Sequence, residues 1–257
     1  MAGPMVLAAW LARIPAALSE ADAHLGLANR LALPFARRVF LSFPIEGRTG
    51  RKYRVSGRPL PKRSRLSGQS EARKRLGLPA KGAVLLVFGG SQGARVLNEL
   101  VVERFGASGP AILHLAGERD YASLVDRVKR PDYVLLGFTN EFGAALAACD
   151  LGLARAGGSV WELAAAGKPA VLVPFPYATA DHQAKNARYF SGGGGAITVP
   201  ESELERVPDL LIELLNDRAR LEEMSKAMLT LARPKAADEI AEELIALARE
   251  RRGGGAR

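Results

Sequence analysis

The stretch from Ala83 to Asn98, AVLLVFGGSQGARVLN, carries the pattern that decides the fold. An apolar run ends at Phe88, a glycine-rich segment follows, and apolar residues resume at helical spacing, which predicts a strand, a tight turn and a helix start. Glycines let a ligand approach the backbone, and the amides of a helix start favour a phosphate group. A plain strand-to-helix turn without a ligand is the alternative. The candidate phosphate-binding residues are Gly89, Gly90, Ser91, Gln92 and Gly93.

Composition limits the class of protein. The 257 residues are 48% hydrophobic and carry a net charge of +9, which suggests either an anionic partner or the surface of an arginine-rich proteome. No nucleic-acid-binding motif accompanies the charge, so nucleic acid is not an expected partner. The single cysteine, Cys149, excludes internal disulfides and cysteine-based zinc sites and suits a reducing cytoplasm. No apolar run reaches the roughly 18 residues of a membrane span.

The order of apolar segments predicts an α/β fold. Six short apolar runs alternate with helical patterns from residue 83 onward, which is typical of a parallel, doubly wound sheet. These runs lie at 83–88, 111–115, 133–136, 151–154, 170–173 and 196–199. We expect four segments: an incomplete α/β domain at 1–65, a basic linker at 66–82, a Rossmann-like domain at 83–234, and a C-terminal helix with a disordered Gly/Arg tail at 235–257. That helix is expected to pack back on the N-terminal domain.

The loops that follow the strands carry the candidate site, because ligands of such sheets bind at the carboxyl ends of the strands. Gly157, Gly158 and Ser159 repeat the glycine turn at a helix start. One turn on, Glu162 is placed to accept hydrogen bonds from ribose hydroxyls, or to act only as a carboxylate at a helix N-terminus. His182 and Gln183 can bond sugar hydroxyls. Together these features indicate a nucleotide diphosphate with a sugar attached, held without a metal because no Asp-x-Asp chelate appears.

Two long segments resemble the MurG family of bacterial peptidoglycan synthesis. They are GGSQGARVLN at 89–98 and FTNEFGAALAACDLGLARAGGSVWELAAAGKPAVLVPFPYATADHQAKNA at 138–187. Residues 3–32 resemble the late part of that family's N-terminal domain. The resemblance implies a GT-B fold of two Rossmann-like domains, the N-terminal one incomplete here. It also implies an inverting transferase that moves N-acetylglucosamine from UDP-GlcNAc to the C4 hydroxyl of undecaprenyl-pyrophosphoryl-MurNAc-pentapeptide, and no cofactor.

The resemblance also assigns roles residue by residue. The 89–93 loop would hold the diphosphate, Thr139 would contact uracil through its backbone, Gln183 would read the sugar hydroxyls, and Asp22 falls in the nucleotide-sugar site. The segment that would wrap phosphate and ribose comprises Gly157, Gly158, Ser159, Val160, Trp161 and Glu162. It is one residue shorter than the family's usual pattern, so its register is open by one position.

Departures from the family limit what the chain is expected to do. The family's first glycine-rich loop, of the GGTGGH type, has no counterpart here, and the catalytic base is expected in that missing segment. We therefore expect the chain as given to bind UDP-GlcNAc without transferring it. Two alternatives stay open: another GT-B transferase that forms a glycolipid, and a UDP-sugar-binding remnant.

Location follows from the lipid acceptor that the resemblance implies. We expect a peripheral protein on the cytoplasmic side of the bacterial plasma membrane, in contact with its anionic surface. Trp10 and Leu11, on a short apolar helix with arginines nearby, are the candidate membrane contacts. A core helix of the N-terminal domain is the alternative.

Overall fold

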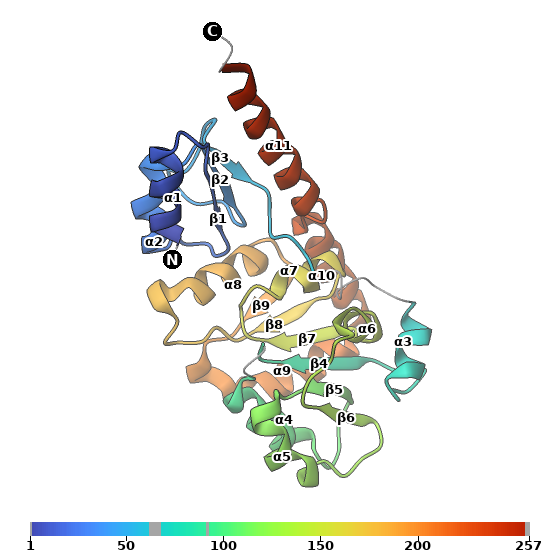
Figure 1. Ribbon diagram of the computed structural model, residues 1–257. Helices are drawn as coiled ribbons and strands as arrows, with labels where there is room; N and C mark the ends of the chain where they lie inside the picture. Colours follow the sequence, from blue (N-terminus) through green and yellow to red (C-terminus); the bar gives the residue numbers. More distant parts are fainter. Residues whose placement is uncertain (1, 62–67, 91–92, 255–257) are drawn as a thin grey trace. The chain divides into compact units, whose positions relative to one another are not determined.

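The computed structural model describes residues 2–61, 68–90 and 93–254 (Figure 1). The chain forms two compact units. One comprises Met1–Leu60 together with Arg233–Arg257, and the other comprises Pro61–Ala232. The first unit is therefore built from both ends of the chain, and the second from its middle.

Six parallel strands form the sheet of the second unit. They are β4 (Val84–Phe88), β5 (Ala111–Leu115), β6 (Tyr133–Leu136), β7 (Leu151–Ala154), β8 (Ala170–Leu172) and β9 (Ala196–Thr198), in the order β6-β5-β4-β7-β8-β9. The chain builds outward from β4 to β6 and then returns to the other side of β4 with β7. Such a reversal creates a crevice at the carboxyl ends of the central strands. The predicted α/β class with a parallel sheet is confirmed.

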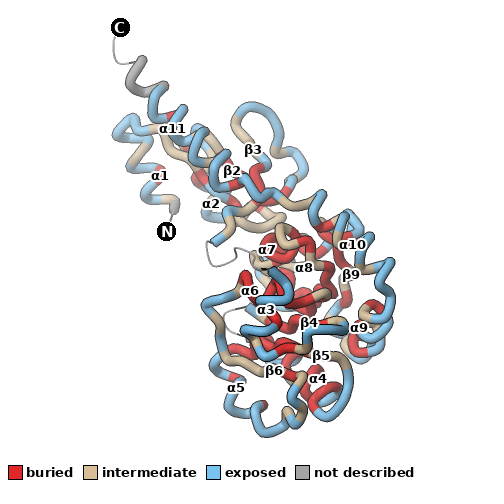
Figure 2. The backbone as a smooth tube through the Cα atoms, turned by 90° about the vertical axis from the view of Figure 1, so that its right-hand side faces the viewer, coloured by how far each residue is buried: buried red, intermediate tan, exposed pale blue. Residues whose placement is uncertain are grey.

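Helices cover both faces of this sheet (Figure 1). They are α4 (Arg95–Phe105), α5 (Glu118–Leu124), α6 (Phe142–Ala148), α7 (Val160–Ala165), α8 (His182–Gly192), α9 (Val207–Asn216) and α10 (Arg218–Leu231), with 3-10 turns η3 (Val125–Arg127), η4 (Thr179–Asp181) and η5 (Glu201–Arg206). Every residue of β4 is buried, as Figure 2 shows for the centre of this unit. Strands β4, β7 and β8 are continuous apolar runs because their residues are buried on both faces of the sheet.

Helix α3 (Gln69–Arg75) belongs to the second unit and packs against α6. The Arg73 side chain is buried; its Nη2 lies 2.7 Å from Asp150 Oδ2, and its Nε donates to the carbonyl of Ala148 at 2.9 Å. Asp150 Oδ2 also accepts from the amide of Val84, the first residue of β4. A buried arginine needs a carboxylate and carbonyls as partners, and Arg73 finds them within this unit. The part of the predicted basic linker that forms α3 therefore belongs to the second unit. Residues 62–67 lie outside the described residues.

The first unit contains a three-stranded parallel sheet in the order β1 (Ala17–Glu20), β2 (Arg38–Leu41) and β3 (Tyr53–Val55). Its helices are α1 (Ala2–Leu11), α2 (Leu27–Ala32), the 3-10 turn η1 (Leu33–Phe35) and α11 (Ala236–Gly254). Val6, Leu18, Val39 and Leu41 contribute to its small core.

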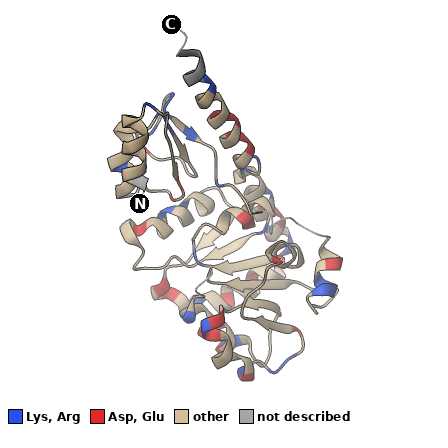
Figure 3. Ribbon diagram, in the orientation of Figure 1, with Lys and Arg blue, Asp and Glu red and all other residues tan. Residues whose placement is uncertain are grey.

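Two arginines attach α11 to the small sheet. Glu243 of α11 accepts hydrogen bonds from Arg38 Nε at 2.9 Å and from Arg54 Nε at 3.1 Å. These bonds lower the pKa of the Glu243 carboxyl. Figure 3 marks the positions of acidic and basic residues along α11. The helix continues to Gly254, into the Gly/Arg segment that the sequence predicted to be disordered.

Candidate functional site

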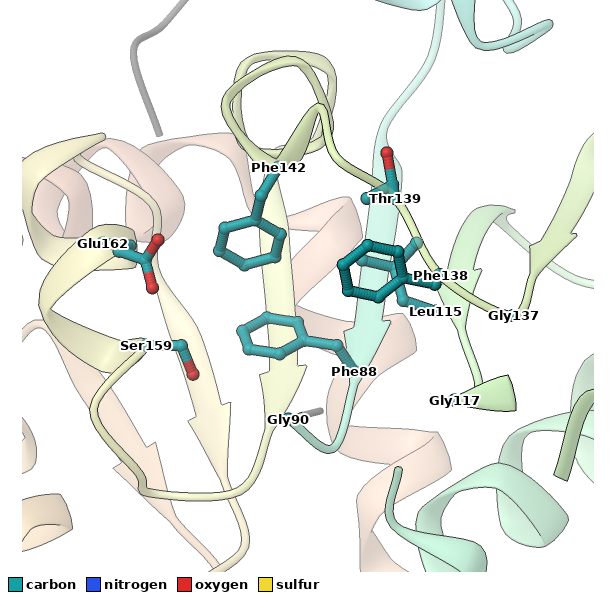
Figure 4. A pocket seen from close by; sticks show the side chains of 10 residues that line it. All are labelled: Phe88, Gly90, Leu115, Gly117, Gly137, Phe138, Thr139, Phe142, Ser159 and Glu162. Atoms are coloured by element: carbon teal, nitrogen blue, oxygen red, sulfur yellow. The ribbon is translucent and has the colours of Figure 1, made fainter. Parts of the chain in front are cut away.

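A pocket opens at the carboxyl edge of the sheet of the second unit (Figure 4). Four successive strand-to-helix connections contribute to its wall. Those after β4, β5 and β6 lie on one side of the switch point between β4 and β7, and the one after β7 lies on the other side. The lining residues are Phe88, Gly90, Leu115, Gly117, Gly137, Phe138, Thr139, Phe142, Ser159 and Glu162. The structure therefore brings together four of the predicted site residues: Gly90, Thr139, Ser159 and Glu162.

Aromatic rings form the apolar part of the pocket. Phe88, the last residue of β4, meets Phe142 edge to face, with ring centroids 5.2 Å apart and an interplanar angle of 80°. Phe138 is half-exposed on the loop that follows β6. Such a surface suits a flat heterocyclic ring. The site list from the sequence omitted Phe88, Leu115 and Phe142; their position at strand ends and at a helix start was the signal that could have found them.

Glu162 supplies the charge of the pocket. It lies in the first turn of α7 and is 8% exposed, and its side chain extends toward the pocket from the opposite side to Thr139 (Figure 4). Its amide donates to the carbonyl of Ser159 at 3.0 Å. A carboxylate at this helix start is stabilised by the helix dipole and can also accept ligand hydroxyls.

Glycine is required by geometry at two positions of the first loop. Gly93 has φ +71°, and a Cβ there would lie 2.4 Å from the carbonyl oxygen of Ala116. A Cβ on Gly89 would lie 2.2 Å from the amide nitrogen of Ala94. The loop thus folds tightly against its own helix and against the end of β5. Ser91 and Gln92 lie outside the described residues.

Thr139 has its hydroxyl engaged within its own loop. Its Oγ1 accepts a hydrogen bond from the amide of Glu141 at 3.0 Å. That bond uses a lone pair and leaves the O–H donor of Thr139 available. The family resemblance implies that Thr139 contacts the base through its backbone.

The second glycine turn presents backbone rather than large side chains. The amide of Val160 donates to Gly157, and that of Trp161 donates to Gly158. The side chains of Val160 and Trp161 are buried, and Trp161 packs against Phe190 with ring centroids 5.3 Å apart. These two predicted site residues can contact a ligand only through their main chain.

His182 and Gln183 are the first two residues of α8, directly after the loop from β8, and they do not line the pocket. Gln183 Oε1 accepts from the amide of Phe175 at 2.9 Å, and His182 Nδ1 lies 2.9 Å from the carbonyl of Thr179. Ala180 and Asp181 have φ near +55°, a left-handed conformation that is uncommon outside glycine. The loop therefore holds both side chains in fixed orientations at the start of α8.

Arg155 fixes the beginning of this loop, a role that sequence reasoning missed. Its Nη1 donates to the carbonyls of Val173 and Pro174 at 3.2 Å, and its Nη2 lies 2.5 Å from Glu201. Its guanidinium also lies over the ring of Phe175, 5.4 Å from the centroid. An arginine directly before a glycine turn was the only signal in the sequence.

Asp22 lies in the first unit, in the loop after β1. Glu20 organises that loop: its carboxylate accepts from the amides of Asp22 and Gly26 and from Asn29 Nδ2. Glu20 is 7% exposed, and its role as the centre of the loop was not predicted. Trp10 and Leu11 are exposed on α1 of the same unit, with 52% and 69% of their surface accessible.

Within the described residues, no group of three or more His, Cys, Asp or Glu side chains is arranged to hold a metal ion. The helices in that part of the chain all fall short of the length and apolar character needed to cross a bilayer.

Comparisons with known proteins identify the family. Residues 84–240 match the glycosyltransferase family 28 C-terminal domain. A protein of Halothermothrix orenii is 35% identical over 91% of this chain and 68% of its own length, and one of Synechococcus elongatus is 42% identical over 86% of this chain and 62% of its own length. Both are named UDP-N-acetylglucosamine--N-acetylmuramyl-(pentapeptide) pyrophosphoryl-undecaprenol N-acetylglucosamine transferase.

A solved structure agrees with these relatives. The crystal structure of MurG from Acinetobacter baumannii is 28% identical, with a TM-score of 0.76 over 94% of this chain and 70% of that chain. This chain thus spans about two thirds of the length of the proteins that it matches. The resemblance noted in the sequence is confirmed: the chain belongs to the MurG family of glycosyltransferases.

Proposed function

We propose that this chain carries the donor site of an inverting transferase that moves N-acetylglucosamine from UDP-GlcNAc to a polyprenyl-pyrophosphoryl-MurNAc-pentapeptide. In that reaction the acceptor's C4 hydroxyl attacks C1 of GlcNAc. The new C1–O bond forms as the bond from C1 to the diphosphate oxygen breaks, UDP leaves, and the proton of the acceptor hydroxyl passes to a general base. The observation that carries the proposal is the pocket shared by four strand-end loops at the switch point of the sheet.

The pocket divides into parts that suit a nucleotide. The aromatic surface of Phe88, Phe138 and Phe142 would receive uracil, whose polar edge would meet the backbone of Thr139. The Glu162 carboxylate would accept hydrogen bonds from the ribose hydroxyls. The base would thus meet aromatic rings and backbone groups, and the ribose would meet a carboxylate.

The two glycine turns would hold the diphosphate. Gly90 lines the pocket in front of α4, and Gly157 to Ser159 precede α7. The amides at a helix start carry partial positive charge and would stabilise the negative charge that develops on departing UDP. Donor binding on these terms needs no metal ion.

The first unit would bring the transferase to the membrane that contains its lipid acceptor. Its helices α1 and α2 expose apolar side chains, and Arg13, Arg30 and Arg37 of the same unit are exposed. The exposed apolar residues are Met5, Leu7, Trp10, Leu11, Leu27 and Leu31. Tryptophan favours the bilayer interface, and each arginine near an anionic surface contributes about 1 kcal/mol. We place the protein at the cytoplasmic face of the plasma membrane on this basis.

Sedimentation with vesicles tests the membrane proposal. Binding to anionic vesicles that weakens with salt and falls in Trp10→Ser is expected, and Tyr177→Ser, an exposed aromatic change in the other unit, is the control. Equal binding to neutral and anionic vesicles would contradict the electrostatic part.

A transfer assay tests the reaction. Labelled UDP-GlcNAc is supplied with either the lipid-linked MurNAc-pentapeptide or diacylglycerol. Label in the first acceptor supports the proposal, and label in diacylglycerol identifies a glycolipid-forming transferase instead. Donor binding without label in either acceptor restricts this chain to the donor half of the reaction.

A further inference from the structure

A chain of buried polar side chains lies behind the pocket and takes no part in lining it. The hydroxyl of Tyr133 in β6 lies 2.8 Å from Nδ1 of His114 in β5, and Nε2 of His114 lies 2.9 Å from Oδ1 of Asn98 in α4. His114 is fully buried, and Asn98 and Tyr133 are 1% and 4% exposed. We call these three residues the Tyr133–His114–Asn98 chain.

The hydrogen bonds that Asn98 makes with the rest of the protein determine the direction of its bond with His114. Asn98 Nδ2 donates to the carbonyl of Ala116 at 2.8 Å and to Oδ2 of Asp120 at 2.9 Å. Both partners are acceptors, so Asn98 Oδ1 must accept, and His114 must carry its proton on Nε2. Burial lowers the pKa of His114 to about 3, so the ring is neutral. With its one proton on Nε2, the ring accepts from the Tyr133 hydroxyl at Nδ1.

The chain ends at the contact between two walls of the pocket. Asn98 donates to the carbonyl of Ala116, and Gly93 packs against the same carbonyl. A Cβ added to Gly93 would lie 2.4 Å from its oxygen. Ala116 lies between Leu115 and Gly117, which both line the pocket, and Gly93 closes the turn that Gly90 opens. Asp120 also faces Gly93: its Oδ2 lies 3.5 Å from the position of a Cβ added to Gly93. Asp120 is ion-paired with Arg119.

We infer that the Tyr133–His114–Asn98 chain is a positioning device: it sets the distance between the β5 wall of the pocket and the glycine turn at the start of α4. These groups act through Ala116 and Gly93 and do not touch the ligand. The inference rests on the proposed function, because it assigns that glycine turn to the diphosphate. A directional, fully satisfied chain specifies one orientation of Asn98, whereas an apolar core at the same place would stabilise the fold without doing so.

The variants separate positioning from stability. His114→Leu removes the bond that orients Asn98, Tyr133→Phe removes only the terminal hydroxyl, and His114→Gln restores an N–H donor. Leu113→Ala is the matched control: Leu113 is fully buried on the same strand, and its side chain points to the opposite face of the sheet. Its cavity lowers stability without affecting Asn98.

UDP affinity is measured by titration well below the lowest unfolding midpoint. We expect His114→Leu to weaken binding about tenfold and Tyr133→Phe about threefold, with His114→Gln close to the parent. Leu113→Ala should retain the parent affinity despite its lower unfolding midpoint. Unchanged affinity in His114→Leu, or an equal loss in Leu113→Ala, would overturn the inference.

A second measurement does not depend on a ligand. In protein labelled with ¹⁵N-glycine, the amide signals of Gly93 and Gly117 should shift in His114→Leu and return toward the parent in His114→Gln, and should stay in place in Leu113→Ala. If the parent does not bind UDP, the proposed function fails, and this measurement still decides the inference: unmoved Gly93 and Gly117 signals in His114→Leu would overturn it.

Discussion

The side-chain oxygen of Gln183 accepts a hydrogen bond from the backbone amide of Phe175, 2.9 Å away, across the loop between β8 and α8. This bond fixes which end of the amide can face a ligand. The oxygen is engaged within the loop, so the NH₂ group is the end available to a sugar hydroxyl. Gln183 would thus read the donor sugar as a hydrogen-bond donor.

Gln183→Glu should therefore separate the sugar from the nucleotide. The variant keeps an acceptor for the Phe175 amide but loses the NH₂ donor that would bond the sugar. We expect UDP-GlcNAc to bind about 1–2 kcal/mol more weakly while the affinity for UDP changes less. Titration of both ligands measures the difference. An equal loss for the two ligands would show that Gln183 does not contact the sugar.

The role of Glu162 can be tested with a matched pair of ligands. Glu162→Gln should weaken UDP binding by about 1–3 kcal/mol, because ribose hydroxyls lose a charged acceptor. The same change should cost much less with 2′-deoxy-UDP, which lacks one of the hydroxyls. Glu141→Gln, an exposed change on the next loop, is the control. Equal losses for the two nucleotides would leave Glu162 as a carboxylate that only stabilises the start of α7.

The buried Arg73 should be far more important to stability than its exposed neighbour. Arg73→Met removes the partner of Asp150 and of three backbone carbonyls and should lower the free energy of unfolding by about 3 kcal/mol. Arg75→Met breaks the ion pair between Arg75 and Glu141, two side chains that are about half exposed. It should lower the free energy of unfolding by less than about 1 kcal/mol. Urea denaturation of both variants measures this. Similar losses would contradict the placement of α3 in the second unit.

His114 should make stability depend on pH in a defined window. Its pKa in the folded protein is about 3 because of burial, below the ordinary value of 6.5. Below pH 6.5 the unfolded chain therefore binds a proton that the folded chain does not, and stability falls as the pH drops toward 3. The slope for one proton is about 1.4 kcal/mol per pH unit. Denaturation between about pH 7 and pH 4.5 should show a smaller slope in His114→Gln. Equal slopes would mean that His114 is protonated in the folded state.

The sheet could be predicted closely because its strands are short, mainly apolar runs with glycine, proline or polar residues soon after them. The predicted runs 111–115, 133–136 and 151–154 coincide with β5, β6 and β7. The carboxyl-end rule then selected the edge of the sheet at which Glu162, Ser159 and Thr139 line one pocket. Periodicity and strand direction were sufficient for these features.

Other features depend on tertiary contacts that have no local pattern. Arg73 looks like any residue of a basic segment until Asp150, 77 positions away, is placed beside it. Trp161 belongs to a glycine-rich motif, yet its ring is buried against Phe190. His114 has no neighbouring partner in sequence, and its bonds to Asn98 and Tyr133 arise only when α4, β5 and β6 come together.

Isothermal titration of the 257-residue chain with UDP-GlcNAc tests the central claim most directly. We expect saturable binding that excess UDP displaces, that weakens in Glu162→Gln, and that EDTA leaves unchanged, because helix-start amides and not a cation hold the diphosphate. The absence of binding, or binding that requires added Mg²⁺ or Mn²⁺, would contradict a UDP-sugar site built from the strand-end loops of this sheet.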